Sequence, residues 1–164
     1  MRLPLIAFTA AALILTGCGE KSGEVIRHRI PNSTFPILQA VEVPADATLV
    51  YLSGAGPQIV NTEAEPRTPA AYGNITEQTE STLATIEDRL EAIDLAMSDV
   101  IKMQVYLVAS KGETSMDFSG FMEGYVKYFG TDAQPNLPTR SVFEVAGLAN
   151  PGWLVEIEVV AVRN

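Results

Sequence analysis

The sequence predicts an α+β domain in the order β-β-α-β-α-β-β, with two helices on one face of a mainly antiparallel sheet. Two segments repeat apolar residues at steps of three and four, as amphipathic helices do, and five segments are β-rich or alternate apolar with polar residues. Hydrophobic residues make up 47% of the 164 residues and charged residues 19%, a composition typical of a globular protein. The length suits one domain of ordinary size.

The first two predicted strands lie in the N-terminal third of the chain. Residues Glu24–Ile30 form the first strand and Thr48–Ser53 (TLVYLS) the second. The second strand ends at Gly54-Ala55-Gly56-Pro57, because glycine and proline interrupt regular structure. Residues 58–73, which contain two further prolines, predict a loop.

The first predicted helix begins at Asn74. The Asn74 side chain can accept a hydrogen bond from a free backbone amide of the first turn, and Glu77 stands where a capping box has its reciprocal partner. The apolar stripe of this helix consists of Ile75, Thr79, Leu83, Ile86, Leu90, Ile93 and Met97. The opposite side is predicted to face solvent, and it carries Glu80, Glu87, Asp88 and Glu91.

A strand and a second helix follow. Val100–Val108 alternates, with Ile101, Met103, Val105 and Leu107 on one face and Lys102, Gln104 and Tyr106 on the other. The second helix has an aromatic stripe that predicts core packing, formed by Phe118, Phe121, Met122, Tyr125 and Phe129. Gly130 suits the position after a helix C-terminus.

The last two predicted strands are Arg140–Ala146 and Leu154–Val162. Two helices can cover only one face of this sheet, so the second face meets water or another subunit. We expect that open face to collect the polar members of the strands, which are Arg140, Glu156, Glu158, Lys102 and Gln104. A face of such mixed polarity is typical of a wet interface with clefts, and it predicts oligomerisation.

The charge balance excludes several classes of function. Asp and Glu number 20 against 11 Lys and Arg, a formal net charge of -9. Nucleic-acid binding usually depends on a basic face that releases counterions, so we expect no nucleic-acid partner. The single cysteine excludes an intramolecular disulfide, and with a single histidine we expect no zinc or other His/Cys metal site.

The N-terminus predicts an export signal. Met1-Arg2 precedes an apolar run of 13 residues, Leu3–Leu15, which is shorter than the roughly 20 residues that span a bilayer. The run ends in Leu15-Thr16-Gly17-Cys18, which resembles the lipobox of bacterial lipoproteins. Residues 1–17 are then the signal peptide, and Cys18 is the lipidated N-terminus. The alternative is an ordinary secretory signal with an incidental cysteine.

The lipoprotein interpretation also predicts a location. Gly19 follows the cysteine where a retained lipoprotein would carry Asp, and by resemblance to lipoprotein sorting this favours the outer membrane, facing the periplasm. The membrane is then contacted through the lipid only. Residues 18–32 hold the lipidated cysteine, a tether and the start of the first strand, and residues 33–164 form the folded domain. Cleavage removes one Arg and no acid, which takes the net charge from -9 to -10.

Two C-terminal motifs carry a family resemblance. Pro138–Ala146 (PTRSVFEVA) and Val155–Val162 (VEIEVVAV), with the earlier blocks Pro36–Val41 (PILQAV) and Leu52–Gly54 (LSG), resemble the RidA/YjgF family of imine and enamine deaminases over about residues 33–163. The resemblance implies a chorismate-mutase-like fold and a homotrimer with a ligand cleft at each subunit boundary. It implies no metal and no cofactor.

The resemblance also implies roles for individual residues. Arg140 would bind the substrate carboxylate, as the planar donor fork of a guanidinium does well. Glu156 would hold or activate the attacking water. The backbone amide of Val142 would contribute to carboxylate binding, and Ser53 would line the cleft.

Three positions depart from the deaminating members of the family. Ile37 stands where they carry Tyr, Met122 where they carry Asn, and Ala55 where Gln is common. Ile37 and Met122 would therefore line the substrate pocket as apolar residues. The loss of a hydroxyl and an amide indicates a pocket that has changed around the surviving carboxylate-binding residue.

The predicted function is hydrolytic deamination of small reactive 2-imino or enamine acids to 2-oxo acids and ammonia in the cell envelope. The alternative is a non-catalytic module that binds a small metabolite, such as a carboxylate, in the same cleft between subunits. A ribonuclease activity, which is attached to some relatives of the family, is disfavoured by the net charge of -9.

Overall fold

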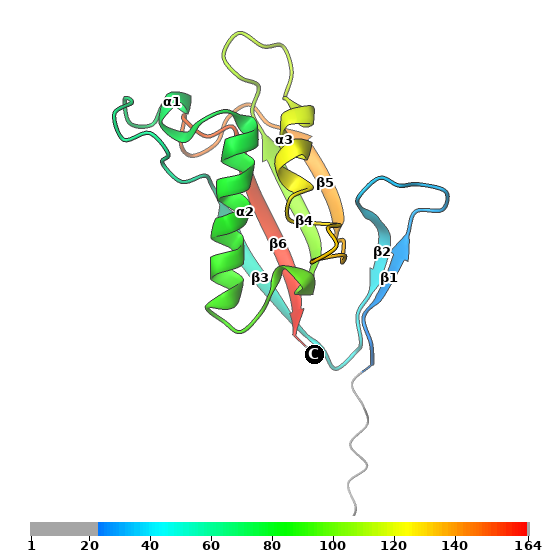
Figure 1. Cartoon of the computed structure of the whole chain (residues 1–164). Coiled ribbons are helices and arrows are strands. Elements are labelled where there is room, and N and C mark those ends of the chain that lie inside the picture. Colours follow the sequence, from blue (N-terminus) through cyan, green and yellow to red (C-terminus); the bar gives the residue numbers. More distant parts are fainter. Residues whose placement is uncertain (1–22, 164) are drawn as a thin grey trace, which may run out of the picture.

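The computed structural model describes residues 23–163 and confirms the predicted α+β class (Figure 1). The strands are β1 (Ile26–Arg29), β2 (Leu38–Glu42), β3 (Thr48–Ala55), β4 (Val100–Leu107), β5 (Thr139–Glu144) and β6 (Val155–Arg163). The helices are α1 (Pro69–Tyr72), α2 (Ile75–Glu91) and α3 (Phe118–Tyr125), with a 3₁₀ turn η1 at Met97–Asp99. The predicted signal peptide and Cys18 lie outside the described residues. Within the described part, no helix is long and apolar enough to cross a membrane.

Four strands form one sheet in the order β3-β6-β4-β5. Strand β6 pairs antiparallel with both β3 and β4, whereas β5 runs parallel to β4. The sheet is therefore mainly antiparallel, as predicted. Helices α2 and α3 lie on the same face of it (Figure 1), which leaves the other face open.

The hairpin of β1 and β2 lies beside the β5 edge of this sheet (Figure 1). The Leu38 N–H donates to the Pro138 carbonyl at 3.0 Å. From β1, the Arg27 guanidinium donates to the carbonyls of Leu137 and Ser98, both at 2.8 Å, and of Val100 at 3.1 Å. These bonds fix the position of the hairpin, and through it the position of the loop between β1 and β2.

Strand β2 is missing from the predicted order, which has two strands before the first helix where the structure has three. It has only five residues, two of which, Gln39 and Glu42, are exposed. It forms because β1 supplies its hydrogen-bonding partners, a contact between segments that local propensity does not report. The predicted loop at residues 58–73 also contains the single turn α1, which starts at Pro69.

The start of α2 is confirmed and its end is not. Asn74 Oδ1 accepts from the Glu77 N–H at 3.0 Å, and the Asn74 N–H donates to Glu77 Oε2 at 2.8 Å, which completes the capping box. The predicted stripe continues to Met97, but α2 ends at Glu91. Asp94 turns the chain in the left-handed region, with φ of 58°, and leaves Ile93 38% exposed. Periodicity alone does not detect such a turn.

Helix α3 also ends early, at Tyr125, and its C-terminal cap is Val126. Gly130, with φ of 75°, serves a later turn in which its N–H donates to the Gln134 carbonyl at 3.0 Å. Phe129 is nevertheless buried, and its ring stacks on Tyr125 with centroids 5.1 Å apart. The predicted packing role of the aromatic stripe is confirmed, although the helical extent of the segment is not.

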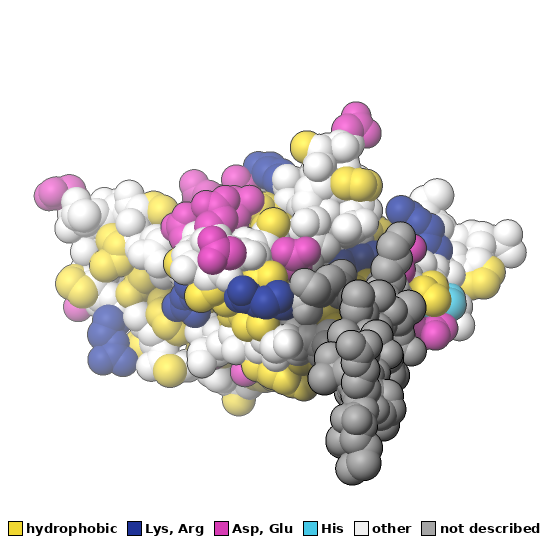
Figure 2. Space-filling view, turned by 90° about the horizontal axis from the view of Figure 1, so that it is seen from below, with side chains coloured by type: hydrophobic (Ala, Val, Ile, Leu, Met, Phe, Trp, Pro, Cys, Tyr) yellow, Lys and Arg dark blue, Asp and Glu magenta, His cyan; other side chains and the backbone are white. Residues whose placement is uncertain are grey.

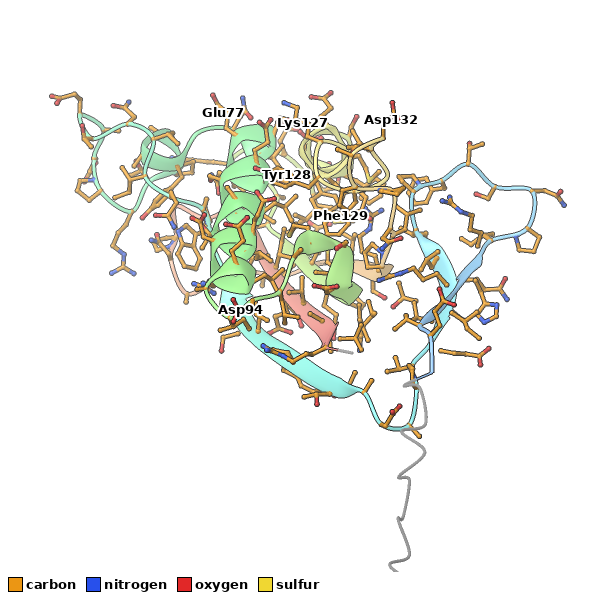
Figure 3. The ribbon with its side chains drawn as sticks, turned by 60° about the horizontal axis from the view of Figure 1, so that its bottom comes forward. Glu77, Asp94, Lys127, Tyr128, Phe129 and Asp132 are labelled. Atoms are coloured by element: carbon orange, nitrogen blue, oxygen red, sulfur yellow. The ribbon has the colours of Figure 1, made fainter. Side chains whose placement is uncertain are left out.

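Polar contacts outside the core join α2 to the segment that follows α3. Lys127 Nζ lies 2.5 Å from Glu80 Oε1, and the Tyr128 hydroxyl donates to the Glu80 carbonyl at 3.1 Å. Figure 3 shows Lys127 and Tyr128 beside α2. The acidic side of α2 faces solvent as predicted, and Figure 2 shows acidic side chains gathered over that side of the molecule.

One fully buried polar side chain connects α2 to the segment before β6. Gln78 Nε2 donates to the carbonyls of Gly73 (2.9 Å) and Gly152 (3.2 Å), and Gln78 Oε1 accepts from the Leu154 N–H at 2.8 Å. Because an unpaired buried polar group is costly, this side chain stabilises the junction through three backbone groups at once.

We expect Gln78→Leu to lower the free energy of unfolding by about 2–4 kcal/mol, since it leaves these backbone groups without their partner. Equilibrium urea unfolding measures the change. Gln58→Leu is the matched control, because Gln58 is exposed and bonds only to Ser81 and Thr85 at the surface of α2. Equal losses in the two variants would contradict the assigned role of Gln78.

Candidate functional site

Strand pairing places the two predicted catalytic residues on opposite faces of the sheet. Arg140 is the partner of Met103, which is fully buried beneath the helices, so the Arg140 side chain lies on the helix face. Glu156 is the partner of Tyr106, which lies on the open face. The expectation that Arg140 shares the open face with Glu156 is therefore wrong. Alternation within β5 allows either assignment, and only the register against β4 decides between them.

On the helix face, the Arg140 guanidinium is surrounded by an aromatic cage formed by Phe35, Phe118, Phe121 and Tyr125. The guanidinium carbon lies 4.1 Å from the ring centroid of Tyr125 and 5.2 Å from that of Phe121. The rings of Phe35 and Phe118 lie at 5.6 and 6.0 Å. Helix α3 supplies three of the four rings, and the loop between β1 and β2 supplies Phe35.

The cation in this cage lacks a carboxylate partner among the described residues. The Arg140 Nη1 atom is buried and has no hydrogen-bond partner within residues 23–163. Burial lowers the pKa of the guanidinium from its ordinary value, and the neighbouring Tyr125 opposes that shift. Burial raises the pKa of the Tyr125 phenol well above its ordinary value, so the phenol stays neutral, and its hydroxyl donates to the Pro36 carbonyl at 2.9 Å. A buried cation costs free energy unless it is paired, and a bound carboxylate would provide the pair.

A cleft of about 210 Å³ opens beside Arg140, between β2 and the start of β5. It is lined by Leu38, Gln39, Lys102, Met103, Thr139, Arg140 and Ser141. Lys102 adds a second cation to this lining, and no ion pair holds its ammonium group within the described residues. The cleft therefore suits an anion, with neutral polar groups available for the remaining part of a small molecule.

The open face of the sheet has a different character. The Tyr106 hydroxyl donates to Glu158 Oε2 at 3.3 Å, and Gln104 Nε2 donates to the Tyr106 oxygen at 3.4 Å. Burial and, after it, Glu158 and Glu156 raise the pKa of Tyr106. Large apolar side chains are also exposed on this face: Tyr51 is 73% and Phe143 47% exposed. This combination is typical of a subunit interface, which the sequence predicts.

Glu156 lies against the backbone of β3 on that face. A Cβ atom added to Gly54 would come within 2.3 Å of Glu156 Oε1, so a side chain at this position would require the Glu156 carboxylate to shift. Ser53 precedes Gly54 at an irregularity in the pairing of β3 with β6, and its side chain is exposed. Ser53 is thus the sequence neighbour of the glycine that the Glu156 carboxylate approaches.

The comparison with protein families decides the identity. The family model described as endoribonuclease L-PSP matches residues 31–163. The chain belongs to this family, the RidA/YjgF family. The predicted resemblance and the chorismate-mutase-like fold class are both confirmed.

Individual relatives of the RidA/YjgF family show the extent of the likeness. A RutC family protein of Haemophilus influenzae is 31% identical over 84% of this chain and 94% of its own length. The 2-iminobutanoate/2-iminopropanoate deaminase of Salmonella typhimurium is 27% identical over 87% of this chain and 99% of its own. The crystal structure of TdcF of Escherichia coli with bound serine matches with a TM-score of 0.56 and 27% identity, covering 85% of this chain and 98% of that one.

The site residues predicted from the RidA/YjgF motifs divide into two groups. Arg140 and Val142 lie on the helix face of β5, and Ile37 and Met122, both half-buried, belong to the elements that also supply the aromatic cage. Ser53 and Glu156 form the second group, on the open face. One protomer therefore does not assemble the complete predicted site, because its own sheet separates the two groups.

Phe35 is the residue that sequence reasoning missed. It precedes the Pro36-Ile37 block, and its only sequence signal is a large aromatic residue in an otherwise polar loop. Phe118 and Tyr125 are predicted as packing residues, and the structure gives them a second role around Arg140. Among residues 23–163, no group of three or more His, Cys, Asp or Glu side chains is placed to hold a metal ion.

Proposed function

We propose that this protein hydrolyses 2-imino and enamine acids to 2-oxo acids and ammonia. The observation that carries the proposal is the half-buried Arg140, whose buried Nη1 atom has no hydrogen-bond partner among residues 23–163 and whose side chain lines a cleft of about 210 Å³. A carboxylate is the ligand that matches this donor best. Family membership and a relative named 2-iminobutanoate/2-iminopropanoate deaminase support the reaction class.

The reaction balances with water as the only co-reactant. An enamine first takes up a proton from solvent at its carbon and becomes the protonated imine. The Glu156 carboxylate takes a proton from water as the water oxygen bonds to the carbon of the protonated imine, and the π electrons of the carbon–nitrogen bond pass to nitrogen, which becomes an amine. Glu156 then returns this proton to the amine, the carbon–nitrogen bond breaks with ammonia as the leaving group, and the carbon–oxygen bond becomes the carbonyl of a 2-oxo acid as the hydroxyl proton passes to solvent. Arg140 holds the substrate carboxylate throughout, and no electron is exchanged.

The proposal includes a homotrimer with the catalytic cleft at the subunit boundary. Arg140 and Glu156 lie on opposite faces of the sheet, so a cleft that uses both must take them from two copies of the chain. The exposed Tyr51 and Phe143 on the open face are suited to burial against a second copy. Closed symmetry would repeat the same cleft at each boundary.

Imine hydrolysis by the purified protein tests the function. An amino-acid oxidase generates 2-imino acids in situ, and semicarbazide traps the imine that has not been hydrolysed. We expect the protein to accelerate the loss of imine in a saturable manner. An intact oligomer that accelerates no imino acid, small or bulky, would overturn the deaminase proposal.

Non-catalytic metabolite binding is the second candidate, and the apolar Ile37 and Met122 favour it. A binding module needs the Arg140 cation and a shaped pocket but no positioned water. Isothermal titration with stable 2-oxo acids distinguishes the two candidates when it is combined with the imine assay. Tight binding that depends on Arg140, without turnover, would support the binding module.

We also propose that the protein is anchored by a lipid at Cys18 in the outer membrane, facing the periplasm. The support is the lipobox-like sequence Leu15–Cys18 after a short apolar run. Metabolic labelling with radioactive palmitate is expected to mark the protein in cells and to fail in Cys18→Ala. Labelling that persists in that variant, or that is absent from the natural protein, would contradict the anchor.

A further inference from the structure

The aromatic cage around Arg140 has an inner and an outer part. Phe121 and Tyr125 are fully buried and belong to the core between α3 and the sheet. Phe35 is 42% exposed, and Phe118, at the first position of α3, is half-buried. The two outer rings are therefore the members of the cage that a ligand bound to Arg140 can touch.

We infer that this site selects 2-imino acids with a bulky, apolar side chain, and that Phe35 and Phe118 are specificity-determining residues. The inference rests on the proposed deaminase function and names its substrate class.

The distances bring the outer rings within reach of a substrate side chain. A carboxylate that bonds to a guanidinium brings its own carbon within about 4 Å of the guanidinium carbon. The ring centroids of Phe35 and Phe118 lie 5.6 and 6.0 Å from that same guanidinium carbon. Both rings are therefore within reach of the atoms that follow the carboxylate in the substrate. A methyl group covers little of this aromatic surface, whereas a branched or aromatic side chain covers much of it.

Hydrogen bonds order the backbone of the loop that carries Phe35. The Phe35 N–H donates to Ser33 Oγ at 3.1 Å, and the Phe35 carbonyl accepts from the Ile37 N–H at 2.8 Å. The adjacent Pro36 carbonyl accepts from the buried Tyr125 hydroxyl at 2.9 Å, which ties this loop to α3. An ordered loop loses little backbone entropy when a ligand covers the exposed ring that it carries.

The cleft beside Arg140 is mainly polar. Gln39, Lys102, Thr139 and Ser141 are among its lining residues, and neither Phe35 nor Phe118 is. The cleft offers polar partners to the imine nitrogen and the water, while the two outer rings lie around the guanidinium itself. A molecule with a carboxylate, a polar imine and an apolar side chain matches this division, and a second charged group on the side chain would meet the rings unfavourably.

The test compares imino acids made by an amino-acid oxidase from alanine, leucine and phenylalanine, in the same semicarbazide assay. We expect kcat/KM for the leucine- and phenylalanine-derived imines to exceed that for the alanine-derived imine by about tenfold or more, because a single methylene in an apolar pocket is worth about that factor. Phe35→Ala and Phe118→Ala should each lower this ratio several-fold, and Phe35→Leu should retain more of it. Ile93→Ala, which trims an exposed side chain beyond the end of α2, is the control with an unchanged ratio.

The possible results distinguish a failure of the inferred substrate class from a failure of the proposed deaminase function. If no imino acid is hydrolysed, the proposed function fails. If hydrolysis occurs and the alanine-derived imine is preferred, the function stands and the inference is overturned. The inference is also overturned if both Phe variants keep the natural ratio, or lose all three activities in the same proportion while circular dichroism shows them folded.

Discussion

Arg140→Met is expected to lower kcat/KM for imine hydrolysis by at least about 100-fold, since hydrogen bonds to a charged group are worth about 1.5–3 kcal/mol each. The Met side chain keeps an apolar stem between the rings of the aromatic cage but offers no donor to a carboxylate. Loss of the cation–π attraction and removal of an unpaired buried charge act on stability in opposite directions. The variant should therefore remain folded while it loses activity.

Arg140→Lys is the informative companion to this variant. Lysine keeps the positive charge and loses the planar fork, so it should recover part of the activity and show a raised KM. Steady-state kinetics, with size-exclusion chromatography to confirm an unchanged oligomer, measures both effects. Full activity in Arg140→Met would show that the substrate carboxylate is bound elsewhere, and an unfolded variant would indicate a structural role for the guanidinium.

Glu156→Gln is expected to lower kcat by about 10²–10⁴-fold with little change in KM, because the amide keeps the shape of the side chain but does not take a proton from water. Glu158→Gln is the matched control. Glu158 lies on the same strand and the same face, and it accepts from the Tyr106 hydroxyl at 3.3 Å, a bond that the amide oxygen of Gln also accepts. A comparable loss in both variants would argue for a shared electrostatic effect of the open face instead of a general base at Glu156.

The Arg140→Met and Glu156→Gln variants together test whether two subunits share the site. Co-expression yields mixed oligomers in which about a quarter of the subunit boundaries bring a natural Arg140 to a natural Glu156, if the two residues come from different copies. Activity should therefore return to about a quarter of the natural level. Mixed oligomers with no more activity than the separate variants would place both residues of a working site in one chain.

Elements governed by local rules are predicted well from the sequence. The capping box of Asn74 and Glu77, the apolar stripe of α2 up to Leu90 and the alternation in β4 all appear in the structure. Each depends on the geometry of a helix or strand over a few residues, which the sequence displays directly. The family motifs around Arg140 and Glu156 can likewise be recognised from the sequence, because each lies within one short segment.

Features that depend on contacts between distant segments are predicted poorly. Strand β2 exists because β1 pairs with it. Phe35 reaches Arg140 because the bonds of Arg27 and Leu38 place the hairpin beside β5. The pattern of residues within each segment does not indicate which other segment it will contact.

By itself, the sequence determined the α+β class, the family, and the two residue types suited to carboxylate binding and to base chemistry. Only the tertiary structure decided that Arg140 lies beneath the helices in an aromatic cage while Glu156 lies on the open face. The alternation of apolar and polar residues shows which side chains of a strand share a face, but either face of the strand can pack against the core. The pairing of Arg140 with Met103, formed between strands far apart in the chain, decides the face of Arg140 and leaves Glu156 on the other face of the same sheet.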